Sequence, residues 1–122
     1  MATSVPKQVQ SGALSNTNVF NEVTDVASGA TVTVVTFTVP VGKKLLLSLI
    51  EFSGENIAEY EVFIDSSTEG KKLTYFSGPL AGDFFFNNLE ISTGIVIELK
   101  VRNFRPETAD FTGRILGTVQ DE

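Results

Sequence analysis

Hydrophobic and polar side chains alternate along most of the chain from residue 17 onward, and Gly, Pro, Asn and Asp interrupt the alternation at short intervals. A period of two is typical of β-strands that bury one face. The regular stretch "TGIVIELKVRNF" is predicted to turn its aliphatic side chains inward: Ile95, Ile97, Leu99 and Val101. The whole pattern predicts about eight strands in an all-β, antiparallel two-sheet β-sandwich that is jelly-roll-like.

Two strands depart from simple alternation. In "TVTVVTFTV" the phase slips at Val34-Val35, which predicts a β-bulge. "KKLLLSLIEFSG" is apolar on both faces, which predicts a central strand. One face is expected to carry Leu46, Ile50 and Phe52, and the other Leu45, Leu47 and Leu49. In "IAEYEVFID" we expect Tyr60, Val62 and Ile64 inward and Glu59 and Glu61 outward, followed by a turn over "SSTEG".

Three consecutive phenylalanines stand in "GDFFFNNLEI". Phe84 and Phe86 can share a core, whereas Phe85 must face the other way. A bend at Asn87-Asn88 would reset the phase, because Asn tolerates the left-handed region, and would bring Leu89 and Ile91 to the interior. Phe85 is therefore predicted to be exposed and available to another protein surface.

The first 16 residues are polar and follow neither a strand nor a helix period. Such a segment buries too little apolar area to order itself, so residues 1–16 are predicted to form an extended N-terminal arm and residues 17–122 the sandwich domain. The arm is held either by its own domain or by a neighbouring chain, and its polar composition with few apolar anchors favours the neighbour. The residues expected to bind a partner are Val5, Pro6, Lys7, Gln8, Val9 and Leu14 of the arm, together with Phe85. Val35, Leu46 and Val96 are further apolar residues expected on the surface.

The sequence offers few residues for catalysis or metal binding. Cys and His are both absent, which excludes Ser-His and Cys-His nucleophiles and disfavours transition-metal sites. Glu59 and Glu61 could form a carboxylate pair, but their place on an amphipathic strand favours a solvated face. The turn "DSSTEG" offers oxygen donors without calcium-loop spacing. We therefore expect no enzyme, no cofactor, no metal and no small-molecule substrate.

The charge narrows the choice of partner. The chain has a formal net charge of −6, and its Lys and Arg residues are scattered or paired. Nucleic acid is disfavoured because its binding requires clustered cations. The longest apolar run, "LLLSLI", is far shorter than a membrane span, so no membrane partner is expected.

The layout of "TFTVPVGKKLLLSLIEFSG", "YEVFID", "KKLTYFSG" and "GIVIELKVRNF" resembles that of small virion proteins of tailed phages. It is similar in particular to capsid decoration or cement proteins of the jelly-roll type. The resemblance covers residues 30–117 and implies a structural protein on the phage capsid exterior, made in the host cytoplasm. It also implies two partners, the major capsid protein and further copies of the chain in a homotrimer.

Related sandwiches serve in phage tails and fibres, which leaves an alternative function. A tail- or fibre-associated module would recognise a glycan or a host receptor. Sugar sites usually present exposed aromatic rings, and here Trp is absent and only Tyr60 and Tyr75 carry polar-tipped rings.

Overall fold

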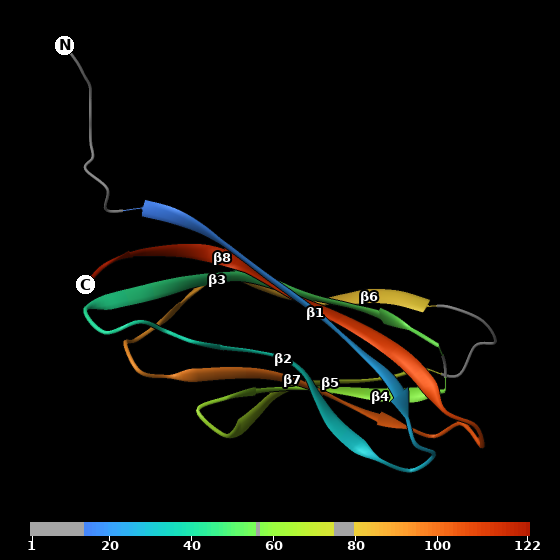
Figure 1. The fold of residues 1–122 in the computed structure, drawn as a ribbon. Coiled ribbons are helices and arrows are strands. Elements are labelled where there is room, and N and C mark those ends of the chain that lie inside the picture. The colour runs from blue at the N-terminus through green and yellow to red at the C-terminus, as the bar shows by residue number, and fades with distance from the viewer. Residues whose placement is uncertain (1–13, 56, 75–79) are drawn as a thin grey trace.

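The protein folds into two layers of β-sheet, which Figure 1 shows edge-on. The computed structural model describes residues 14–55, 57–74 and 80–122. The strands are β1 (Leu14–Val26), β2 (Thr31–Thr38), β3 (Lys43–Gly54), β4 (Ala58–Ile64), β5 (Ser67–Thr74), β6 (Leu80–Ile91), β7 (Val96–Asn103) and β8 (Ala109–Asp121). The described residues contain no helix, and the all-β fold with eight strands is confirmed.

The strand order is that of a jelly roll. Sheet I has the order β1-β8-β3-β6, and sheet II has the order β2-β7-β4-β5. Four antiparallel pairs, β1 with β8, β2 with β7, β3 with β6 and β4 with β5, form one long ribbon that is rolled up on itself. The rolling brings both ends of the described chain into sheet I, so segments far apart in sequence share one face.

The core lies between the two sheets and follows the predicted alternation. On β7, Ile97, Leu99 and Val101 are fully buried, and on β4 Tyr60 and Val62 are fully buried, as expected. Aromatic rings join the two sheets at one end of the core. The ring of Phe52 stacks on that of Tyr60 with centroids 3.9 Å apart, and Phe111 meets Tyr60 edge-on at 6.0 Å.

The predicted bulge in β2 is confirmed, but its consequence differs from the expectation. The register against β7 shifts between Thr33 and Val35. Both Val34 and Val35 point into the core, so the prediction that Val35 is exposed is wrong; its side chain is only 3% exposed. Gly113 on β8 makes the room, because a Cβ there would lie 2.9 Å from Val35 and 3.0 Å from Val34.

A second bulge changes the faces of β3. The register shifts between Leu47 and Leu49 against both β6 and β8. Inner positions therefore pass from Leu45 and Leu47 to Ile50 and Phe52, all of which are buried. The predicted grouping of Leu46 with Ile50 and Phe52 is wrong, and Leu46 shares the outer face with Leu49. The central position of β3, between β8 and β6, is confirmed.

The Asn87-Asn88 bend lies opposite this second bulge and is confirmed. Both residues have positive φ, 50° and 61°. Phe84 and Ile91 are buried inside, while Phe85 is 69% exposed. Leu89 pairs with the buried Leu47 and thus lies on the inner side, yet it is 42% exposed because β6 is an edge strand.

The turn before β5 is shorter than predicted. Asp65 and Ser66 both have positive φ, 53° and 65°, and connect Ile64 directly to Ser67. Two central residues with positive φ are typical of a type I′ hairpin turn, whose twist matches that of the strands. The remainder of "SSTEG" therefore belongs to β5 and not to the turn.

Most of the predicted arm lies outside the described residues, including Val5, Pro6, Lys7, Gln8 and Val9. The described chain begins with β1 at Leu14, where Leu14, Ser15 and Asn16 pair with the end of β8. Three residues assigned to the arm are thus part of sheet I.

Tyr60 gives the first testable prediction. Its side chain is fully buried, its hydroxyl has no hydrogen-bond partner among the described residues, and burial raises the pKa of the phenol far above its ordinary value. Because an unpaired buried hydroxyl is costly, we expect Tyr60→Phe to raise the free energy of unfolding by about 1 kcal/mol. Chemical denaturation at pH 7 measures this gain, and a loss of stability would contradict it.

Tyr60→Phe should also differ from the wild type in how its stability changes at alkaline pH. The folded-state pKa of Tyr60 lies above the unfolded value of 10.0, so ionisation of this phenol leaves stability unchanged below pH 10 and favours the unfolded state as the pH rises above 10. Above pH 10 the wild type should therefore lose stability relative to Tyr60→Phe by up to about 1.4 kcal/mol per pH unit. Parallel denaturation curves from pH 8 to 12 test this, and a constant difference would contradict it.

Candidate functional site

The outer faces of the two sheets differ in chemistry. On sheet II, β2 exposes a row of threonines: Thr31, Thr33, Thr36 and Thr38. The neighbouring strands pair opposite charges, with Glu59 opposite Arg102 and Glu61 opposite Lys100. This outer face is mainly polar, although it also carries Phe63, whose ring lies 5.0 Å from Lys100 Nζ, and the exposed Val96. It agrees with the interpretation of Glu59 and Glu61 as members of a solvated surface.

The outer face of sheet I has an apolar centre. Leu116 on β8 pairs with Leu49 on β3, and Leu49 pairs with Phe85 on β6. Leu116 and Leu49 are half-buried, and Phe85 at the end of the row is exposed. We call these three residues the apolar row. Its position follows from the β3 bulge, since without that bulge Leu49 would face the core.

An aromatic residue and an ion pair lie beside the apolar row. Phe20 on β1 is 53% exposed and pairs with Arg114, whose guanidinium carbon lies 5.1 Å from the centre of the Phe20 ring. The Nε of Arg114 lies 3.8 Å from a carboxylate oxygen of Glu51. On the other side of the row, Lys44 lies 3.6 Å from Glu90. Charged pairs thus flank the apolar row on both sides.

A hollow opens next to Phe20 and Arg114. The next pair along β3 and β8 is Ser53 opposite Thr112, two small side chains whose hydroxyls are hydrogen-bonded to one another. They are bordered by three longer side chains, those of Phe20, Arg114 and Glu51. The resulting hollow has a volume of about 230 Å³. We call it the Arg114 hollow.

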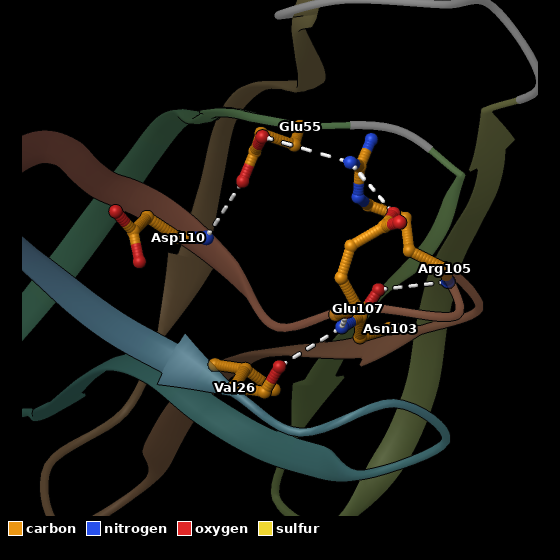
Figure 2. A network of polar contacts seen from close by, with 6 residues as sticks. All are labelled: Val26, Glu55, Asn103, Arg105, Glu107 and Asp110. Carbon is orange, nitrogen blue, oxygen red and sulfur yellow. Dashed lines mark hydrogen bonds and ion pairs between the residues drawn. The ribbon is translucent and has the colours of Figure 1, made fainter.

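A separate polar cluster lies at one end of the sandwich (Figure 2). Asn103, at the end of β7, is fully buried; its side-chain nitrogen donates to the carbonyls of Val26 and Glu107, and its oxygen accepts from the backbone N–H of Arg105. Arg105 also lies 2.8 Å from Glu107 and 3.9 Å from Glu55. These contacts connect the loops after β1, β3 and β7, so the cluster has a structural role.

Only some of the residues predicted to bind a partner lie on the outer face of sheet I. Phe85 lies on the outer face of sheet I as predicted, Leu46 is half-buried on the same face, and Val96 is exposed on sheet II. The backbone of Leu14 starts β1. Sequence reasoning missed Phe20, Arg114 and the hollow, because these depend on which strands lie side by side.

Three further observations concern sugars, metals and membranes. The Tyr60 ring, considered for stacking on a sugar, is fully buried and cannot reach one. In the described ranges, no three side chains of Asp, Glu, His or Cys come together as a metal site requires. No helix in the described part of the chain is long and apolar enough to cross a membrane.

Neither a scan against protein-family models nor a search of the curated proteins finds a match for this chain.

Proposed function

We propose that this protein is a non-enzymatic structural component of a phage virion, a capsid decoration or cement protein. It binds the outside of the head and stabilises contacts between subunits of the major capsid protein. The observation that carries the proposal is the unequal chemistry of the two sheets. One outer face is mainly polar, and the other presents the apolar row, in which Phe85 is 69% exposed.

The rest of the molecule fits this role. A cement protein requires a rigid body, and the continuous core between the two sheets supplies one. It also requires a segment that gains order by binding, and the polar N-terminal residues have the composition for it. In this proposal the N-terminal segment contacts the capsid, and the outer face of sheet I contacts neighbouring protein subunits.

Deleting residues 1–13 tests the contact with the capsid. The deletion ends just before β1, whereas removal of residues 1–16 would also break the first three pairs between β1 and β8. We expect the truncated protein to fold, with an unchanged circular dichroism spectrum and denaturation midpoint, and to lose capsid binding. Binding is measured by cosedimentation with heads assembled in the absence of this protein.

The full chain is the matched control and should saturate discrete sites on the heads. Heads that have bound it should also resist heating better than bare heads. Binding to isolated tails and not to heads would overturn the cement assignment. Undiminished binding of the truncated protein would overturn the part assigned to the N-terminal segment.

A further inference from the structure

The outer face of sheet I carries both a projection and a hollow. Phe85 projects from the edge strand β6, and the Arg114 hollow lies over β8 and β3 of the same sheet. From these features we infer that this face binds a second copy of the chain around a two-fold axis, in place of the homotrimer that the resemblance implies. In this dimer the Phe85 ring of each copy occupies the Arg114 hollow of the other. The inference goes beyond the proposed function, since it holds with or without a capsid.

The hollow suits an aromatic ring in size and chemistry. An enclosed apolar cavity of about 150 Å³ is enough for benzene, and the hollow measures about 230 Å³. Its walls include the Phe20 ring and the Arg114 guanidinium, which already lie 5.1 Å apart. An incoming phenyl ring that enters the hollow can contact the Phe20 ring and the guanidinium, both of which favour aromatic partners.

A two-fold arrangement follows because both parts of the contact lie on one face. A two-fold axis that lies in the plane of the face, midway between Phe85 and the hollow, places the Phe85 ring of each copy opposite the hollow of the other. Both contacts therefore form at the same time. This is the self-complementary interface that two-fold dimers use. The flanking ion pairs, Arg114 with Glu51 and Lys44 with Glu90, give the apolar centre the polar surroundings typical of interfaces.

The face is also large enough. Its four strands are 12 or 13 residues long. With strands about 4.8 Å apart and a rise of about 3.3 Å per residue, it measures roughly 19 Å by 40 Å. Each copy therefore offers up to roughly 750 Å², close to the ~800 Å² per partner of a standard stable interface.

The strand edges of sheet I are less suitable for pairing with another copy. On β6 the positive-φ residues Asn87 and Asn88 interrupt the edge. On β1 the edge lies against β2, where the side-chain nitrogen of Asn21 donates to the carbonyl of Val34 at 2.9 Å. Bulges and covered edges are how sheets avoid edge-to-edge association. The face remains the better site for a second copy.

Sedimentation equilibrium of the full chain, without capsids, tests the dimer. We expect a mass of twice the 13.2 kDa monomer at micromolar concentrations. Phe85→Asp and Thr112→Tyr, which remove the projection and fill the hollow, should each weaken dimerisation by about 30-fold or more, as loss of an interface hot spot does. Val41→Asp is the matched control, because Val41 is 92% exposed on the turn before β3, and it should leave the dimer unchanged.

Disulfide cross-linking identifies the contact itself. The chain has no cysteine, so single-cysteine variants report one position each. When Phe85→Cys and Thr112→Cys chains are mixed and oxidised, the mixed disulfide should form at least about 10-fold faster than either symmetric one. Val41→Cys should cross-link with neither.

Each of the following results would overturn the inference: a monomer at 100 μM or above, a mass of three copies, or predominant Phe85→Cys pairing with itself. None of them bears on cosedimentation of the wild type with heads, so the dimer and the capsid role fail separately. Unchanged dimerisation of Phe85→Asp would likewise exclude this face.

Discussion

Phe111→Ala is expected to lower the free energy of unfolding by about 4 kcal/mol, the largest loss we predict for a single substitution. The Phe111 side chain is fully buried and meets Tyr60 edge-on. Its ring also lies against the backbone of Gly54, where an added Cβ would be 2.6 Å from Phe111 Cδ1. Alanine would leave a cavity that two hydrogen-bonded sheets cannot close. Urea denaturation followed by circular dichroism measures the loss.

Phe85→Ala provides the matched control for this prediction. It is the same substitution in the same sheet, but at a side chain that is 69% exposed. We expect a change within about 0.5 kcal/mol. Both variants are measured at two protein concentrations, so that a contribution from association is recognised. Equal losses at the two positions would mean that Phe85 belongs to the core.

The period of two was sufficient to predict the fold class, because it is a local property of each strand. It placed Ile97, Leu99 and Val101 inside, and it placed Phe85 outside between the buried Phe84 and the half-buried Phe86. The left-handed tendency of Asn87-Asn88 is also local, and it was recognised for the same reason.

The errors arose where burial depends on a distant strand. Val35 is buried because Gly113, 78 positions later, leaves space for it in the opposite sheet. Leu47 and Ile50 share the inner face because Ser48 is an extra residue against β8, while β6 accommodates the shift with extra residues of its own at Asn87-Asn88. Neither fact can be deduced from the local pattern, since a bulge is defined by its partner's register.

The candidate site likewise has one part that the local pattern predicts and another that depends on distant strands. Phe85 could be predicted, but the hollow requires Phe20, Arg114 and Ser53 to meet on three strands. The sequence separates them widely, and only the rolled-up ribbon brings them together. Asn103 did leave a local signal. It continues the inward phase of Leu99 and Val101, so a polar residue at that position indicates a buried hydrogen-bonding role.

Asn103→Leu is accordingly expected to cost about 3 kcal/mol, although leucine fits the burial of the site. The substitution removes three hydrogen bonds, each of 2.9 Å, to Val26, Glu107 and Arg105. The bond to the Val26 carbonyl is fully buried, so water cannot replace it, and an unpaired buried group costs more than a hydrogen bond contributes. Chemical denaturation measures the loss.

Asn18→Leu is the matched control, since Asn18 is exposed on β1, and its effect should stay within about 0.5 kcal/mol. The ion pairs around Arg105 cannot compensate at position 103. The side chains of Glu55 and Glu107 are 42% and 61% exposed, and ion pairs that are open to solvent contribute at most about 1 kcal/mol. A loss of less than about 1 kcal/mol in Asn103→Leu would therefore contradict the importance of the Asn103 side-chain amide. It would mean that backbone hydrogen bonds, such as that from the Gly29 N–H to the Asn103 carbonyl, are sufficient to stabilise this end of the sandwich.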